Sequence, residues 1–316
     1  MNILELKEVT KTFGKRVILD DVSLTVEEGD IFGLIGQSGS GKTTLLNLLV
    51  GFYQPTEGKV SYQIDPHKKP KEVSQHLSTV KKTFGFASQV SSFYPKLTVN
   101  ENLLHFGHLY GIKKPVLKGN IKSLLTFTEL LEHKNRLSEH ISVGMQKRLD
   151  LSCSLIHKPK VLILDEPTAD LDPVLQKEIL HLIKQSNKQG ITIIIASHHL
   201  NDIEHICNKV ALIHKGKLVH SGTVEEIKKP YLQKEGAIHF KVGEFHHKMI
   251  GLLEKLPLKR IVDKKDSLVI YSSKLQNTLH QLISLAQKEH IPLLDLDIKK
   301  PTLQDVFEKI VKNQPK

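Results

Sequence analysis

The sequence predicts an α/β protein in two parts. The first is a mixed-sheet core with antiparallel N-terminal strands and a helical subdomain, and the second is a small C-terminal α+β domain. The chain has 316 residues, and at about 150 residues per domain this length fits two domains. Hydrophobic residues make up 39% and charged residues 25% of the chain, which is typical of folded proteins and excludes disorder as the main state. Apolar runs of strand length alternate with helical periodicity over residues 161–214, as in a parallel sheet.

The N-terminal segments show two kinds of strand pattern. Residues 3–13 and 19–30 alternate apolar and polar side chains, which predicts half-buried antiparallel strands. Residues 31–35 form a short apolar strand, and a glycine-rich stretch then leads into an apolar segment with helical spacing, residues 45–50. From 61 to 82 the composition is polar and no period persists, so we expect a strand end followed by a surface insertion.

The middle of the chain predicts a helical subdomain followed by a return to strands. Between about residues 90 and 155 apolar side chains recur every three or four positions, which favours helices. Strand patterns follow at 161–164, 191–196 and 209–214, separated by helical segments. We therefore expect one domain over residues 1–227 with βαβ units and a parallel sheet.

The pattern starts again after the Lys-Lys-Pro sequence at 228–230. A separate domain is expected over 228–316. Its predicted order is strand 238–242, helix 244–256, two strands around 264–265, helix 275–288, strand 293–298 and helix 303–312.

Charge and composition exclude several classes of protein. The net charge is +11, and +7 of it lies in residues 228–316. The excess consists of scattered pairs such as Lys228-Lys229 without the interleaved aromatics of a base-stacking platform, so we expect no direct nucleic-acid binding. A basic face near anionic lipid or a partner protein fits better. No apolar run approaches the roughly 18 residues of a membrane span, and the N-terminus lacks a signal-peptide pattern, so a cytoplasmic protein is expected. Cys153 and Cys207 suggest neither a disulfide framework nor a zinc site.

The glycine-rich stretch carries the strongest functional motif. Residues 36–43 read GQSGSGKT and fit the pattern GxxxxGK[ST]. Glycines let the backbone NH groups surround phosphates, and the following helix offers its positive end. Lys42 should reach the β- and γ-phosphates, and the Thr43 hydroxyl should ligate Mg²⁺. A plain turn before a helix is the alternative, but the apolar strand before it favours a P-loop NTPase core that binds ATP or GTP.

The strand at residues 161–166, VLILDE, ends in two acids. In α/β sheets ligands bind outside the carboxyl ends of the strands, so both acids should face the phosphates. We expect Asp165 to hold Mg²⁺ through its water shell, and Glu166 to orient or deprotonate the attacking water. An acidic pair can also merely cap the next helix. The P-loop upstream favours the catalytic interpretation.

Five further motifs lie in a fixed order across residues 1–227. They are Phe13 in VTKTFG, Gln89 in GFASQ, the segment ISVGMQKR from Ile141, Asp172 in ADLD, and His198 in ASHHL. Together with the P-loop and the acidic strand end, this order resembles the nucleotide-binding subunit of an ABC transporter. Two positions depart from the family pattern, because Val143 replaces the first glycine of the signature motif and Asp170 occupies a position that is usually small.

The resemblance implies a role for each matching residue. The nucleotide-binding residues would be Phe13, Gly36, Gln37, Ser38, Gly39, Ser40, Gly41, Lys42, Thr43 and Thr44. The catalytic residues would be Glu166, His198, Lys42 and Gln89, and the Mg²⁺ ligands Thr43, Gln89 and Asp165. Ser142, Val143, Gly144 and Gln146 would contact the nucleotide of a second subunit, and Asp172 would lie in the D-loop.

The resemblance also implies an assembly. Two copies would form a head-to-tail homodimer around two Mg-ATP and would drive a separate membrane permease, so the protein would lie at the inner face of the cell membrane. The segment PTLQDVFEKI, residues 301–310, resembles the tail of ATPases of the daunorubicin-exporter type and favours export. Two alternatives stay open, namely a soluble ABC ATPase that acts on ribosomes or nucleic acid, and a nucleotide-binding module that hydrolyses poorly because of Val143.

Overall fold

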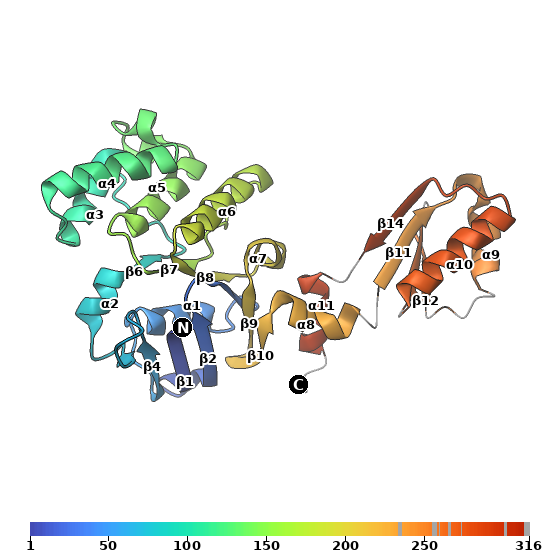
Figure 1. The fold of residues 1–316 in the computed structure, drawn as a ribbon, viewed down its shortest axis with the longest axis horizontal. Coiled ribbons are helices and arrows are strands. Elements are labelled where there is room, and N and C mark those ends of the chain that lie inside the picture. The colour runs from blue at the N-terminus through green and yellow to red at the C-terminus, as the bar shows by residue number, and fades with distance from the viewer. Residues whose placement is uncertain are drawn as a thin grey trace. The chain divides into compact units, whose positions relative to one another are not determined.

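The computed structural model describes residues 1–232, 236–254, 258, 260–264, 267–272, 274–299 and 302–312. These residues form two compact units, Met1–Thr223 and Val224–Lys316 (Figure 1). The second unit begins with helix α8 (Val224–Leu232), so the boundary expected after residue 227 falls within this helix. None of the helices in the described part of the chain combines the length and the apolarity needed to cross a bilayer.

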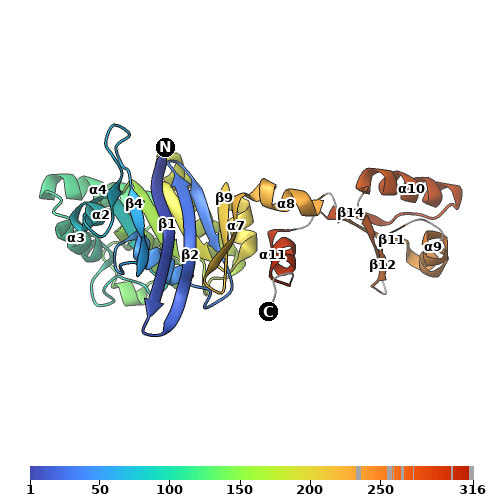
Figure 2. The same ribbon diagram turned by 90° about the horizontal axis from the view of Figure 1, so that it is seen from below.

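The first unit contains an antiparallel sheet with the strand order β2-β1-β4-β5. Its two long strands, β1 (Asn2–Phe13) and β2 (Arg16–Glu27), lie side by side in Figure 2. They are followed by β4 (Glu57–Tyr62) and β5 (Lys71–Glu72). Side chains along a strand point alternately to its two faces. Leu4, Leu6 and Val9 of β1 are buried in the core, as the apolar and polar alternation of the sequence predicts.

A second sheet has the order β10-β9-β3-β8-β7-β6. All of its strand pairs are parallel except that between β10 and β9. The strands are β3 (Ile31–Ile35), β6 (Phe84–Ala87), β7 (Val161–Asp165), β8 (Thr192–Ser197), β9 (Lys209–His214) and β10 (Lys217–Thr223). Every residue of β3, β7 and β8 is buried, because such strands are covered on both faces. The mixed α/β fold class is thereby confirmed.

Helix α1 (Lys42–Leu49) connects the two sheets, since it contacts β2 of the first sheet and β7 and β8 of the second. Its leucines belong to the same apolar cluster as both sheets. Helices α6 (Pro173–Lys188) and α7 (Leu200–Ile206) also contact β8. The start of α1 and the ends of β7 and β8 are therefore fixed by packing.

The segment from 61 to 82 is more ordered than its polar composition suggests. Strand β5 pairs with β4, helix α2 covers Leu77–Thr83, and Val73 and Val80 are buried in the core. The expected strand end is present at Tyr62, but the rest of the segment is not purely a surface insertion, because Val73 and Val80 are buried in the core. Val73 lies before α2 and Val80 within it, so the two buried valines do not form one face of a helix.

The helical subdomain consists of α3 (Val99–Leu109), α4 (Lys114–Phe127) and α5 (Val143–Leu155), with 3-10 turns at Leu131–His133 and Ser138–His140. It has its own core, which includes Leu103, Leu117 and Leu149. A capping box starts α3, because Thr98 and Glu101 exchange side-chain and backbone hydrogen bonds. The predicted helical periodicity thus corresponds to three packed helices.

The second unit contains a four-stranded antiparallel sheet with the order β12-β13-β11-β14. Its elements are β11 (Gly236–Lys241), a 3-10 turn (Gly243–Phe245), α9 (His246–Leu253), β12 (Arg260–Asp263), β13 (Leu268–Ser272), α10 (Leu275–Lys288), β14 (Asp295–Lys299) and α11 (Leu303–Lys312). Ile238, Phe240, Leu253 and Leu282 meet in a separate apolar cluster. The C-terminal α+β fold follows the order of elements that the sequence predicts.

Leu282→Ala should lower the free energy of unfolding of the second unit by about 2 to 5 kcal/mol, because the side chain is fully buried in that unit's core. ATP affinity should stay unchanged, since the P-loop belongs to the first unit. Thermal melting and ATP titration measure the two effects. The matched control is Ile163→Ala in β7, which should weaken ATP binding. A loss of ATP binding in Leu282→Ala would show that the units do not act as separate domains.

Candidate functional site

The P-loop connects β3 to α1, and two of its glycines are required by the geometry. A Cβ on Gly36 would lie 2.4 Å from the carbonyl oxygen of Ile213 and 2.5 Å from Ser40 Oγ. Gly41, directly before α1, has φ 107°, where a side chain would be strained, and a Cβ there would lie 2.8 Å from Leu19. The loop therefore packs tightly against β2 and β9 and presents its backbone toward solvent.

Lys42 is held inside the loop that precedes it. Its Nζ donates hydrogen bonds to the carbonyl oxygens of Gly36 (2.9 Å) and Gln37 (3.3 Å) and lies 3.7 Å from Glu166 Oε1. The residue is 6% exposed. Burial lowers the pKa of the Lys42 ammonium, and the negative charges of Glu166 and Asp165 oppose that shift.

Asp165, the last residue of β7, offers oxygen atoms of the kind that a divalent cation binds. Thr43 Oγ1 donates a hydrogen bond to Asp165 Oδ2 at 2.8 Å. The second oxygen, Oδ1, is buried and has no hydrogen-bond partner among the described residues. Burial raises the pKa of Asp165, and the Thr43 hydrogen bond opposes the shift. A hydroxyl and a carboxylate with an unsatisfied oxygen fit Mg²⁺, which binds through few protein ligands and retains water.

Glu166 connects Lys42 to His198. Its Oε2 lies 2.9 Å from His198 Nδ1 and accepts a hydrogen bond from the His198 backbone NH at 3.3 Å. Its backbone has φ 49°, a left-handed conformation that is unfavourable for a residue with a side chain. Its own NH donates to Ala196 O in β8 (2.9 Å), which helps to hold this conformation. The side chain therefore points to the nucleotide side of the sheet with both oxygens engaged.

Lys42, Thr43 and Glu166 line one cavity of about 460 Å³, whereas Asp165 lies behind Thr43 and is not among the lining residues. Its lining contains Arg16, Ile18, Ser38, Gly39, Gly41, Lys42, Thr43, Thr44, Gln89, Glu166 and His198. The structure thus brings together the P-loop, Gln89, Glu166 and His198 from four separate stretches of the chain. Arg16 and Ile18 were not predicted, because a single cation or aliphatic residue in a strand carries no motif.

Phe13 lies at the end of β1 and is not among the residues that line this cavity. Its ring is 44% exposed and meets the Tyr53 ring edge-on, with the centroids 5.2 Å apart. Lys11 Nζ lies 4.8 Å from the centre of the Phe13 ring. The sequence interpretation missed Tyr53, although its exposed aromatic side chain adds a second stacking surface.

The signature residues lie at the start of α5 and do not line the cavity of their own chain. Ser142 caps the helix, because its Oγ accepts the Met145 NH at 3.3 Å. Val143 is 54% exposed. A Cβ on Gly144 would lie 2.7 Å from Leu175 Cδ2 in α6, and Gln146 Nε2 donates to Ser138 O at 3.0 Å.

Asp172 caps α6, since its Oδ1 accepts the backbone NH groups of Val174 (2.9 Å) and Leu175 (3.0 Å). The preceding Asp170 has φ 63°, so the turn before α6 is strained at that position. Asp172 therefore has a local structural function in the single chain. Any contact with a second copy would be additional to this cap.

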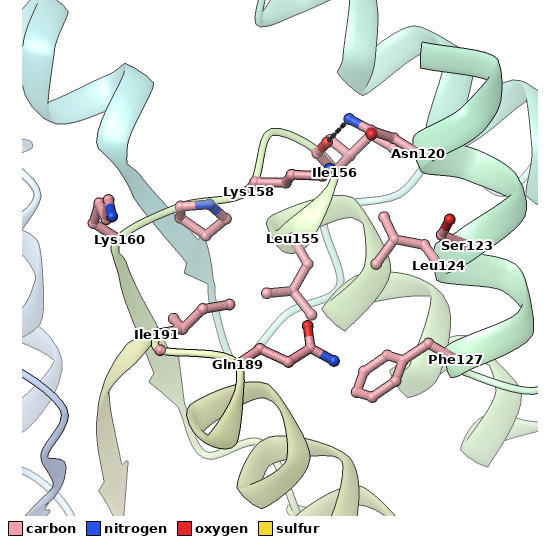
Figure 3. A pocket seen from close by; sticks show the side chains of 12 residues that line it. Asn120, Ser123, Leu124, Phe127, Leu155, Ile156, Lys158, Lys160, Gln189 and Ile191 are labelled. Atoms are coloured by element: carbon pink, nitrogen blue, oxygen red, sulfur yellow. Dashed lines mark hydrogen bonds between the residues drawn. The ribbon is translucent and has the colours of Figure 1, made fainter. Parts of the chain in front are cut away.

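A second cavity of about 420 Å³ lies beside α4 (Figure 3). Leu124 and Phe127 of α4 and Leu155 of α5 line it, together with Gln189 and two lysines, Lys158 and Lys160, from connecting loops. None of the residues predicted for the site lies there. It also contains no carboxylate pair, so it is unsuited to the predicted chemistry.

The fold and the cavity define a P-loop nucleotide-binding domain, and comparison with known proteins identifies its family. Residues 19–169 match the ABC transporter family. The bacitracin transport ATP-binding protein BcrA of Bacillus licheniformis is 31% identical over 98% of this chain and 97% of its own length. The linearmycin resistance ATP-binding protein LnrL of Bacillus subtilis is 28% identical over 96% of this chain and 97% of its own.

A solved structure supports the same assignment. A nucleotide-free ATP-binding cassette from an ABC transporter superimposes with a TM-score of 0.64 at 26% identity, covering 72% of this chain and 94% of that one. The chain belongs to the ABC transporter family. It is an ATP-binding subunit, an ATPase whose activity is coupled to transport, which confirms the resemblance seen in the sequence.

Asp165→Asn should stabilise the nucleotide-free protein at neutral pH and abolish its further stabilisation by Mg-ATP. Because burial raises the pKa of Asp165 above its unfolded value, the ionised carboxylate destabilises the folded state once the pH exceeds the unfolded pKa. The advantage of the Asn variant should therefore shrink as the pH falls through the raised folded-state pKa, and it should vanish once the pH is below the unfolded pKa. Melting curves at pH 8 and at low pH, with and without Mg-ATP, measure this. If the gain in stability of Asp165→Asn did not depend on pH, burial of the ionised Asp165 carboxylate could not be its cause.

Proposed function

We propose that two copies of this chain bind two Mg-ATP between them and power a separate membrane permease that exports its cargo. The observation that carries the proposal is the cluster of Lys42, Glu166 and Thr43 at the cavity formed by the P-loop, with Asp165 hydrogen-bonded to Thr43. Such a subunit would lie at the inner face of the cell membrane. We assign ATP hydrolysis to residues 1–227 and an accessory function to residues 228–316.

Within the site, the binding functions fall to the P-loop. Its backbone and the N-terminus of α1 would hold the phosphates, and Lys42 would exchange its hydrogen bonds to Gly36 and Gln37 for the β- and γ-phosphates. Thr43, Asp165 and Gln89 would hold Mg²⁺, which neutralises phosphate charge when bound. Phe13, with Tyr53 beside it, offers an exposed aromatic surface on which the adenine can stack.

Glu166 is the residue placed to act as general base. It is held at the carboxyl end of β7 with one oxygen toward Lys42 and the other bound by His198. A hydrogen bond from His198 fixes the direction of the carboxylate, and a positioned base contributes roughly 10² to 10⁴-fold to a rate. His198 is half exposed, so its ring can turn toward a γ-phosphate that enters the cavity.

The dimer follows from the position of the signature residues. Ser142 and Gly144 stand at a helix N-terminus, which favours anions, yet they do not line the P-loop cavity of their own chain. A second copy would place them over the nucleotide. Val143 is half exposed at this point and would enter that interface.

The direction of transport is proposed from two observations. The tail at 301–310 resembles that of exporter ATPases. In addition, relatives matched over nearly their whole length are named for bacitracin transport and for linearmycin resistance. Cargo selection would belong to the permease, because the cavity of this chain is lined by phosphate-binding and acidic groups.

Glu166→Gln should keep ATP binding and reduce hydrolysis by roughly 10² to 10⁴-fold, because the amide keeps the shape of the side chain and loses its basicity. The variant should elute as a dimer with Mg-ATP and as a monomer without it. Size-exclusion chromatography and phosphate release measure both effects. Lys42→Ala is the contrasting variant and should lose binding as well. Hydrolysis at the parental rate in Glu166→Gln would remove this residue from the role of base.

Val143→Gly should leave hydrolysis unchanged or faster and should tighten the ATP-dependent dimer. The substitution removes a branched, half-exposed side chain from the position where the signature would approach a phosphate. Analytical ultracentrifugation in the Glu166→Gln background gives the dimer constant without turnover. A weaker dimer would show that Val143 packs favourably in the interface and that the proposed approach is incorrect.

A further inference from the structure

Helix α5 is bonded to the loop that carries Gln89. Lys147 Nζ donates to the carbonyl oxygen of Gln89 at 3.3 Å. Three residues further along the helix, Asp150 Oδ1 accepts both the backbone NH (2.9 Å) and the hydroxyl (2.7 Å) of Ser92. The loop segment 89–92 is therefore held to the helix at both of its ends.

The Asp150 contact is the stronger of the two attachments. Asp150 is 4% exposed. Burial raises the pKa of its carboxyl group, and the two Ser92 hydrogen bonds oppose the shift. A buried carboxylate is costly unless its oxygens are satisfied. Ser92 thus stays bonded to Asp150 when the helix moves, because separation would leave this charge without those donors.

The same helix begins with the signature residues. Ser142 caps it, and Asp150 follows eight residues later, which corresponds to about 12 Å of helix at 1.5 Å per residue. Gly144 packs on Leu175, and Arg148 bonds Glu178 of α6 at 2.6 Å. An α-helix with such contacts moves as a rigid element rather than by local bending.

We propose that Asp150 is a positioning residue that links the signature motif to Gln89, so that ATP held by one subunit shifts Gln89 in the other subunit's own site. The inference rests on the proposed dimer. In that dimer the signature of a chain contacts its partner's ATP, whereas Gln89 of the same chain lines its own cavity. The Asp150–Ser92 bonds make these two positions one mechanical unit, which lets one nucleotide site affect the other.

A spin label at residue 90 tests this directly. Val90 is 79% exposed and lies between the two attachment points, so Val90→Cys gives a reporter on the loop. Cys153 and Cys207 are buried, and burial raises the pKa of both thiols, so they should not react with the label.

The labelled chain also carries Lys42→Ala, which empties its own site. It is mixed with an excess of unlabelled Glu166→Gln chain, and spin-label mobility is recorded before and after addition of Mg-ATP. Any change at residue 90 then comes from ATP bound by the other chain. Size-exclusion chromatography of the same sample shows whether the mixed dimer forms.

We expect ATP to change the mobility of the label, and we expect Asp150→Ala or Ser92→Ala in the labelled chain to abolish most of that change. Ser92→Ala removes one of the two hydrogen bonds without leaving a cavity in the core, so it decides the question if Asp150→Ala does not fold. The matched control is Ser152→Ala. It deletes a buried hydroxyl of the same helix that bonds Thr128 and Arg148 instead of the loop, and it should leave the response intact.

Two spin-label results would overturn the link. One is a mixed dimer in which ATP leaves the label unchanged in the otherwise parental chain. The other is a full response in Asp150→Ala, or in Ser92→Ala if Asp150→Ala does not fold. If the mixed dimer does not form although Glu166→Gln chains dimerise with Mg-ATP, ATP in one site cannot close the pair and the link is refuted. If the Glu166→Gln chains do not dimerise either, the proposed head-to-tail assembly itself is refuted.

Discussion

The site depends on keeping the Lys42 ammonium charged while it is buried next to Glu166 and Asp165. Two unit charges at about 4 Å attract by about 4 kcal/mol at the effective dielectric of a protein surface, whereas an ion without a partner bears its full desolvation cost. The carbonyl oxygens of the P-loop supply the remaining partners of Lys42. The P-loop surrounds Lys42, and the order of the strands places Asp165 and Glu166 next to it. When a triphosphate with its metal binds, its negative oxygens can replace the carbonyl oxygens and Glu166 as partners of Lys42, and its cation can become a partner of Asp165.

The topology of the parallel sheet makes that cluster possible. Strand β8 lies between β3 and β7, so the P-loop, His198 and the acidic pair emerge from three adjacent strand ends. Lys42 and Thr43 reach across the end of β8 to meet Glu166 and Asp165. His198 follows β8 itself and therefore meets Glu166 from the same edge. Glu166 and His198 are held rigidly because they directly follow buried strands. Gln89, in contrast, lies on the loop that follows β6.

Local motifs were predictable from the sequence and distant pairings were not. In the P-loop the residues that surround a phosphate lie at fixed positions along the chain, so Lys42 could be assigned from the motif alone. Asp165 could be assigned because it ends an apolar strand. The aromatic pair of Phe13 and Tyr53 could not, because 40 residues separate two side chains that meet only when β1 and the end of α1 pack together. The bond between Asp150 and Ser92 spans 58 residues for the same reason. Asp172 shows a third case, in which one residue type fits both a family motif and an ordinary helix cap.

The helix α5 shows why such a protein would need a second copy. Its N-terminus carries uncompensated NH groups and a capping serine, which attract anions, but the chain's own phosphate site lies elsewhere. A helix dipole stabilises an anion only near the first turn, so in the proposed dimer α5 would act on the phosphate held by the second copy. In the proposed dimer Val143 would oppose that approach sterically, whereas a Cβ on Gly144 would require Leu175 to shift. In the proposed dimer, these two neighbouring residues would determine how tightly two chains close on nucleotide, and α5 would transmit that closure to the Ser92 loop bonded to Asp150.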